Sequence, residues 1–224
     1  TIQPITEVER IISDYKESKL CFHVDGVQTL GKVELDVSNS NIDLLSVSSH
    51  KIHGPKGVGA LYIKEDVRLK PQLTGGGQER EYRGGTENVP GIVGFGQAVD
   101  LTRDNIEEDT AYIQQLKERL AQGITANLEG VQINGPDPKE GVSHILNLSF
   151  RGLKGEVLIH ALEERNIYAS TGSACSANDS EPSHVLQAMA LDDEAMEGAL
   201  RFSLSSENTK EEIDYVIDML TEIV

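Results

Sequence analysis

Lys51 ends the segment Ser48-Ser49-His50-Lys51, which follows the apolar run 42–47 and precedes a glycine-rich turn at 54–59. A lysine that is partly removed from water loses its proton readily and becomes a nucleophile toward an aldehyde, to which it binds as a Schiff base. The hydroxyl of Ser48 and the imidazole of His50 suit the phosphate of a cofactor. A solvated lysine at the end of an ordinary strand is the alternative.

A carboxylate and an amide precede this lysine in the segment Asp25-Gly26-Val27-Gln28. A carboxylate at a strand end can pair with a protonated ring nitrogen, and an amide can hold a ring hydroxyl. Pyridoxal phosphate needs both kinds of partner, because protonation of its pyridine makes the ring an electron sink. Alone, this segment is typical of a turn; together with Ser48, His50 and Lys51 it favours a pyridoxal phosphate site.

The two cysteines have different surroundings. Cys175 follows Thr171-Gly172-Ser173-Ala174 in a loop of small residues, where a thiol is accessible and free to move. We interpret this loop as an arm that carries the thiol to a site, with an ordinary surface thiol as the alternative. Cys21 lies in the apolar run 20–24, and we expect it in the core. We predict no disulfide between the two cysteines.

Arg201 is a charged residue inside the apolar strand-like segment Leu200-Arg201-Phe202. A guanidinium in such a place needs an anion or several acceptors. Both a structural salt bridge and a clamp for a substrate carboxylate satisfy this need, and the residues alone do not choose between them.

Short apolar runs separated by helical patterns predict an α/β fold whose sheet is mixed and mostly parallel. In such sheets the ligand-contacting residues gather at strand ends, where Asp25 and Lys51 are expected. Capping boxes at Thr6–Glu9 and Thr209–Glu212 predict two helix starts. The expected strands are 20–24, 42–48, 58–63, 144–150, 166–170 and 199–205, and the other expected helices are 88–103, 106–128 and 154–165. The polar stretch 130–141 is the best candidate for a change of subdomain.

Composition narrows the class of protein. The chain has 224 residues and a net charge of −17, which disfavours direct contact with nucleic acid or with an anionic membrane surface. It contains no apolar run long enough to span a membrane and no signal segment. We assign no metal ligands, and two dissimilar cysteines suggest a reducing, cytoplasmic location.

The motifs occur in an order that resembles the cysteine desulfurases of the NifS/IscS type, within the class V aminotransferase superfamily. The resemblance rests on segments spread along essentially the whole chain: 23–28, 48–57, 75–80, 83–86, 173–176 and 200–203. It implies the type I fold of pyridoxal phosphate-dependent transferases. Residues 1–105 would be the remaining part of the cofactor-binding large domain. Residues 106–224 would form an α+β small domain with a mobile cysteine loop near 171–181.

The resemblance also implies a role for each residue. Lys51 would form the Schiff base, Asp25 would pair with the pyridinium, Gln28 would contact the ring hydroxyl, and Ser48 and His50 would bind phosphate. Thr86 would reach the cofactor of the partner in a homodimer. Arg201 would hold the carboxylate of L-cysteine, and Cys175 would take its sulfur as a persulfide, leaving L-alanine. An iron–sulfur scaffold or a thiolation enzyme would then accept the sulfur.

The chain departs from the family pattern in one respect, because it begins just after that pattern's N-terminal portion. The missing portion includes a phosphate loop, a histidine that stacks on the cofactor ring and an asparagine near its hydroxyl, so activity of this chain alone is doubtful. Two other functions stay open at this point: a selenocysteine lyase, and a non-catalytic module for interaction or dimerisation. His53 stands where the family often has tyrosine.

Overall fold

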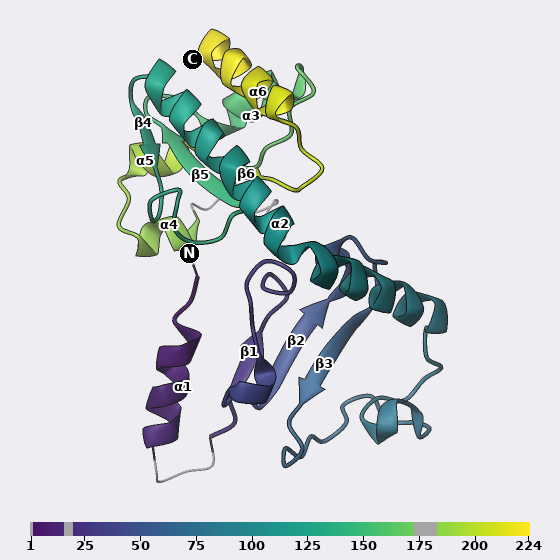
Figure 1. Cartoon of the computed structure of the whole chain (residues 1–224). Helices are drawn as coiled ribbons and strands as arrows, with labels where there is room; N and C mark the ends of the chain where they lie inside the picture. Colours follow the sequence, from purple (N-terminus) through teal and green to yellow (C-terminus); the bar gives the residue numbers. More distant parts are fainter. Residues whose placement is uncertain (1, 16–19, 173–182) are drawn as a thin grey trace. The chain divides into compact units, whose positions relative to one another are not determined.

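The computed structural model describes residues 2–15, 20–172 and 183–224, which form two compact units (Figure 1). One unit contains Gln3–Ile106, and the other is built mainly from Glu107–Val224.

The first unit carries α1 (Ile5–Asp14), β1 (His23–Asp25), η1 (Val37–Asn39), β2 (Leu44–Ser48), η2 (Ser49–Ile52), β3 (Gly59–Ile63), η3 (Gln78–Glu81) and the first part of α2 (Val89–Asn127). The second carries the rest of α2, then β4 (Val131–Ile133), β5 (Ile145–Phe150), α3 (Gly155–Glu163), α4 (His184–Ala188), α5 (Asp193–Glu197), β6 (Ala199–Ser203) and α6 (Lys210–Ile223).

The sheet of the first unit has the strand order β1-β2-β3. Strands β1 and β2 are parallel, with Asp25 opposite Ser46, whereas β2 and β3 are antiparallel. The sheet is therefore mixed, as expected, but only one of its two strand pairs is parallel. Its core is small: Ile52, Phe95 and Ala98 are buried, and Val47 and Val58 pack against them. The first part of α2 supplies Phe95 and Ala98, so this helix covers one face of the sheet.

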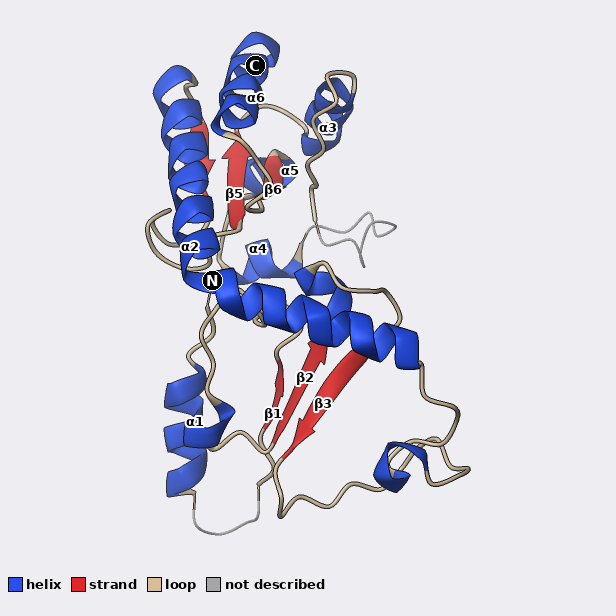
Figure 2. Ribbon diagram, turned by 45° about the vertical axis from the view of Figure 1, so that its right-hand side comes forward, coloured by secondary structure: helices blue, strands red, loops and turns tan. Residues whose placement is uncertain are grey.

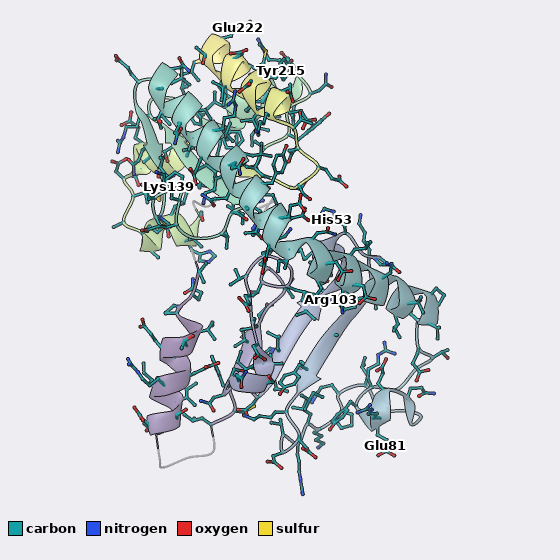
Figure 3. The ribbon with its side chains drawn as sticks, viewed as in Figure 1. His53, Glu81, Arg103, Lys139, Tyr215 and Glu222 are labelled. Atoms are coloured by element: carbon teal, nitrogen blue, oxygen red, sulfur yellow. The ribbon has the colours of Figure 1, made fainter. Side chains whose placement is uncertain are left out.

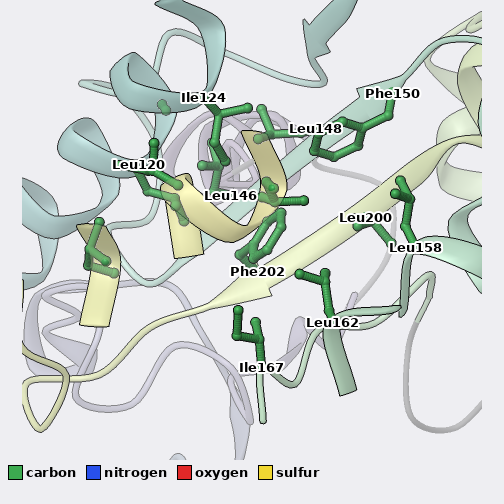
Figure 4. Packing of buried hydrophobic residues seen from close by; sticks show 14 of the residues in the cluster. Leu120, Ile124, Leu146, Leu148, Phe150, Leu158, Leu162, Ile167, Leu200 and Phe202 are labelled. Carbon is green, nitrogen blue, oxygen red and sulfur yellow. The ribbon is translucent and has the colours of Figure 1, made fainter. Parts of the chain in front are cut away.

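The sheet of the second unit is antiparallel, in the order β4-β5-β6. Side chains alternate between the two faces of a strand, so Leu146, Leu148 and Phe150 of β5 share one face with Leu200 and Phe202 of β6. Helices α2, α3 and α6 cover this face (Figures 2 and 4). The buried residues that they add are Leu116, Leu120, Ala121, Ile124, Leu158, Leu162, Ile213, Ile217 and Leu220.

The prediction of separate helices at 88–103 and 106–128 is wrong, because both ranges belong to the single helix α2, which has 39 residues. The polar residues Arg103, Asp104 and Asn105 suggested a break, but none of them removes a backbone N–H or forces a non-helical angle. Arg103 instead pairs on the helix surface with Asp100 and Asp104 (Figure 3), and the Asn105 side chain bonds the carbonyl of Leu101.

Several shorter elements also differ from expectation. Strand β1 begins only at His23, and Cys21 is exposed rather than in the core. In this part of the chain only Val24 faces the core, since neighbouring strand residues point to opposite faces. The expected strand 166–170 reduces to an isolated bridge between Ser170 and Arg201. The stretch 130–141 opens with strand β4, and the small helix α5 was not foreseen.

The two capping boxes have different outcomes. At α6, the Thr209 side chain accepts the backbone N–H of Glu212, and the Glu212 carboxylate accepts the backbone N–H of Thr209, so this box is confirmed. At α1 the expected box is wrong: the N-cap is Pro4, two residues before Thr6, and no side chain caps the helix. Thr6 lies inside the first turn.

Candidate functional site

Four of the expected site residues lie at one end of the first unit's sheet. Asp25 is the last residue of β1, and β2 ends at Ser48, where η2 begins and carries His50 and Lys51. Because β1 and β2 are parallel, their carboxyl ends meet at the same edge, which is where ligands bind in open α/β sheets. The fold thus brings together residues that are more than twenty positions apart in the chain.

The lysine is held by a short and well-anchored turn. Its neighbours Ser49 and Ile52 are buried, whereas Lys51 itself is half-buried and forms no ion pair with any described residue. His53 ends η2 in the left-handed conformation, with φ of 63° (Figure 3), and its N–H and that of Gly54 both donate to the carbonyl of Ser49. The backbone on both sides of Lys51 is therefore fixed, and the side chain is left available.

The expected phosphate ligands form a pair. The Ser48 Oγ lies 2.8 Å from Nδ1 of His50, and His50 is exposed. The hydrogen bond between these two groups uses one donor of the pair, and the donor that remains can bind an anion. Asp25 is also exposed at the strand end; its Oδ1 accepts the N–H of Val27 at 3.0 Å, and the described residues give its Oδ2 no partner. Gln28 lies in the turn that follows and is exposed.

Two further polar residues share this face of the sheet, and the sequence interpretation missed both. His23 Nε2 lies 2.8 Å from Ser46 Oγ. His23 and Asp25 are two positions apart on β1, and Ser46 and Ser48 are two apart on β2, so all four side chains emerge from the same face. The opposite face carries apolar residues under α2. The alternation of polar and apolar residues in 23–25 and 46–48 was the signal that could have identified them.

Thr86 lies in an exposed loop of the same unit, between η3 and α2. The side chain of Gln78 accepts the N–H of Gly85, which ties this loop to the start of η3. Within η3, Glu79, Arg80 and Glu81 have positive φ, a conformation that costs energy for residues with a Cβ. Among the described residues, no hydrogen bond or ion pair joins Thr86 to Asp25 or Lys51.

The remaining expected residues belong to the second unit. Arg201 lies on β6, its backbone pairs with Ser170, and its Nε is buried without a partner among the described residues. The salt-bridge alternative is therefore not supported, since no described carboxylate lies within ion-pair distance of Arg201. Cys175 lies outside the described residues, in the interval between Gly172 and Ser183.

No helix in the described residues has both the length and the hydropathy that crossing a membrane requires. In the same part of the chain, no group of three or more His, Cys, Asp or Glu side chains is arranged to hold a metal ion.

Comparison with known proteins identifies the family. The family model described as aminotransferase class V matches residues 1–216. Cysteine desulfurase IscS of Clostridium botulinum is 46% identical over 225 residues, which cover 100% of this chain and 56% of that protein. IscS of Methanosarcina thermophila is 46% identical over 224 residues and is covered to 54%. A solved NifS-like protein has a TM-score of 0.87 at 37% identity, covering 100% of this chain and 57% of that one.

The chain belongs to the class V aminotransferase family, and its fold is that of NifS-like proteins. The two IscS relatives are named cysteine desulfurases, and proteins of this family depend on pyridoxal 5′-phosphate. The chain spans little more than half the length of these relatives.

Proposed function

We propose that this chain is the part of a pyridoxal phosphate-dependent cysteine desulfurase that carries the cofactor lysine, the sulfur-accepting cysteine and the substrate arginine. The observation that carries the proposal is the 46% identity with IscS over the whole chain, together with the presence of Lys51, Cys175 and Arg201. The substrate is L-cysteine, and the products are L-alanine and a persulfide on the protein.

The residues of the first unit fit the cofactor. Among the described residues, the Oδ2 of Asp25 has no partner and is available for the pyridine nitrogen. The Ser48–His50 pair offers a hydrogen-bond donor to the phosphate, and the amine of Lys51, which forms no ion pair with a described residue, is available for the aldehyde. Gln28 follows Asp25 by three residues and is exposed, so its side chain is available to contact the ring hydroxyl. When bound, pyridoxal phosphate would supply an electron sink that stabilises the electron pair left on the substrate when its carbon–sulfur bond breaks.

The chain's own residues account for the remaining steps. Arg201 binds the substrate carboxylate with its guanidinium, which satisfies the buried Nε. The thiolate of Cys175 attacks the sulfur of L-cysteine, so that a sulfur–sulfur bond forms and the carbon–sulfur bond breaks. The carbon keeps the electron pair and receives a proton, for which the amine of Lys51 is the carrier. L-Alanine leaves, and the persulfide remains on Cys175.

The assembly and the acceptor belong to the same proposal. We place the protein in a homodimer in which Thr86 reaches the cofactor phosphate bound by the partner subunit. The loop that carries Thr86 suits such a contact, because the side chain of Thr86 is exposed to solvent. The persulfide would pass to an iron–sulfur scaffold or a thiolation enzyme.

The test is a labelling experiment on the 224-residue chain. We would incubate it with pyridoxal phosphate, reduce with borohydride and map the modified lysines by peptide mass spectrometry. We expect the label at Lys51 and its loss in Lys51→Ala, with no loss in Lys56→Ala, which removes an exposed lysine of the glycine-rich turn after η2. Scattered labelling of surface lysines, or labelling that survives Lys51→Ala, would contradict the assignment of Lys51.

A second experiment addresses Cys175. In the full-length protein supplied with L-cysteine, Cys175→Ala should abolish the persulfide, whereas Cys21→Ala, which removes an exposed thiol, should leave it. A persulfide that persisted in Cys175→Ala would overturn the role of this cysteine.

A further inference from the structure

A row of polar side chains crosses the face of the second unit's sheet that lies opposite its core. We call it the polar strip and define it as Asn134, Asn147, Ser149 and Arg201. Asn147 of β5 and Arg201 of β6 are directly opposite each other in the ladder. Such pairs share a face, and their Cβ atoms lie about 4.5–5.5 Å apart. The role that we assign to this strip rests on the proposed function, in which Arg201 binds the substrate carboxylate.

Hydrogen bonds fix the direction of every donor on one side of the strip. The Ser149 hydroxyl donates to the carbonyl of Ala195 at 2.5 Å, so its oxygen is left to accept. The Asn134 Nδ2 donates both to this oxygen and to Oδ1 of Asn147, each at 2.7 Å. The backbone N–H of Asn134 also donates to the carbonyl of Asn147, at 2.9 Å, which holds the two residues in register.

This network determines which end of the Asn147 amide faces which neighbour. If the amide were turned over, its Nδ2 would meet the Nδ2 of Asn134, and two donors would oppose each other. If Asn134 were turned instead, its carbonyl oxygen would face a Ser149 oxygen whose proton is committed to Ala195. The Asn147 Oδ1 therefore stays with Asn134, and its Nδ2 is directed away from that residue.

The far side of Asn147 is the side of Arg201, whose Nε is buried and without a partner among the described residues. Asn147 and Arg201 are thus directly opposed residues, and neither the Nδ2 of Asn147 nor the Nε of Arg201 has an acceptor among the described residues. A buried donor left without an acceptor is costly, and two adjacent donors match the two oxygens of a carboxylate. No acidic side chain of β4, β5 or β6 is available for this purpose, since these strands contain none.

We infer that Asn147 is a second binding residue for the carboxylate of the amino-acid substrate, donating from Nδ2 beside Arg201. The strip also adjoins the segment that carries the reactive thiol: Ser170 pairs with the backbone of Arg201, and its Oγ bonds the carbonyl of Gly172, just before that segment. Carboxylate recognition by a planar amide together with a planar guanidinium favours α-amino acids over the corresponding amides or amines.

The experiment is a nuclear magnetic resonance titration of the ¹⁵N-labelled 224-residue chain with L-alanine, the product and a stable carboxylate probe. We expect the Nε–H signal of Arg201 and the Nδ2 signals of Asn147 to shift together. L-Alaninamide, which lacks the carboxylate, should shift neither. Asn147→Asp keeps the acceptor toward Asn134 but replaces the donor by an oxygen, and it should weaken L-alanine binding by about 10- to 100-fold.

A matched control is Asn127→Asp, the same chemical change on an exposed residue of α2 that bonds only the carbonyl of Gly123. It should leave binding unchanged. If L-alanine shifted Arg201 while Asn147 did not move, the inference would be overturned and the role of Arg201 would stand. If neither signal responded at saturating L-alanine, both the inference and the assignment of Arg201 would be wrong. The wild-type titration decides these cases even if Asn147→Asp does not fold.

Discussion

At the scale of single residues, Lys117 is a buried ammonium, and its burial requires hydrogen-bond acceptors nearby. Only 4% of it is exposed, and its ammonium donates to the carbonyls of Glu140, at 3.2 Å, and Val142, at 2.9 Å. These carbonyls belong to the polar stretch between β4 and β5, so Lys117 fastens that stretch to α2. The neighbouring Gln114 does the same by donating to the carbonyl of Pro138 at 2.6 Å.

We predict that Lys117→Met lowers the free energy of unfolding at neutral pH. The methionine fills a similar volume but leaves the carbonyls of Glu140 and Val142 without their donor, which costs about 1–3 kcal/mol. Urea denaturation followed by circular dichroism measures the change. Lys139→Met is the control, because Lys139 is exposed on the same stretch (Figure 3) and should be close to neutral. Equal effects of the two substitutions would contradict the anchoring role.

The same residue predicts a pH dependence. Burial lowers the pKa of Lys117 below its ordinary value of 10.5, because it disfavours the charged form, and the carboxylates of Glu118 and Asp137 oppose this only in part. Between the folded pKa and 10.5 the unfolded chain binds more protons than the folded chain, so stability contributed by this site rises with pH. The wild type should therefore gain stability relative to Lys117→Met as pH approaches 10.5. Denaturation midpoints measured from neutral pH upward test this, and a constant difference between the two proteins would refute it.

At the scale of elements, α1 and α6 show how one sequence motif leads to two structures. Both begin with Thr-x-x-Glu before an apolar pattern. Thr209 is itself extended and caps α6, with Glu212 in the reciprocal role. At α1 the proline at position 4, which has no N–H to lose, becomes the cap, so Thr6 is already helical. The motif was necessary for the box but not sufficient.

This difference predicts the effect of a matched pair of substitutions. Thr209→Ala removes the acceptor of the Glu212 N–H and should destabilise the second unit by about 1 kcal/mol. Thr6→Ala removes no capping bond and should cost nothing, since alanine is the better helix former. Thermal denaturation of both variants measures the contrast. Comparable losses would show that the cap at Thr209 contributes no stability of its own.

The elements and sites predictable from sequence were those with a strong local signal. The strand ends that carry Asp25 and Ser48–Lys51 follow from apolar runs bounded by turns, and the amphipathic spacing of α6 follows from its period. The continuity of α2 did not follow, because Arg103, Asp104 and Asn105 are compatible with both a helix and a turn. The Asn134–Asn147–Ser149 network did not follow either, because it depends on the register of β4, β5 and β6.

At the scale of the whole molecule, the two units have unequal cores. Fifteen described residues form the buried cluster of the second unit, whereas three form that of the first. Each fully buried large apolar side chain contributes about 1.5–3 kcal/mol, so the second unit has the larger driving force for folding. The proposed cofactor residues thus belong to the less stabilised unit, whose exposed apolar side chains include Leu61, Leu73, Ile92 and Val93.

We therefore predict unequal hydrogen exchange along the full chain. Amides of β5, β6 and α6 should exchange slowly, through opening of the larger core, and amides of β1, β2 and β3 should exchange faster. Pyridoxal phosphate attached to Lys51 by borohydride reduction should then slow exchange in β1 and β2 while leaving β5 and β6 unchanged, because a ligand stabilises only the folded state that binds it. Exchange measured by mass spectrometry before and after reduction tests both statements. Equal protection of the two sheets in the unmodified chain would show that core size does not control local stability here. Unchanged exchange in β1 and β2 after attachment would show that Asp25 and the Ser48–His50 pair do not hold the cofactor.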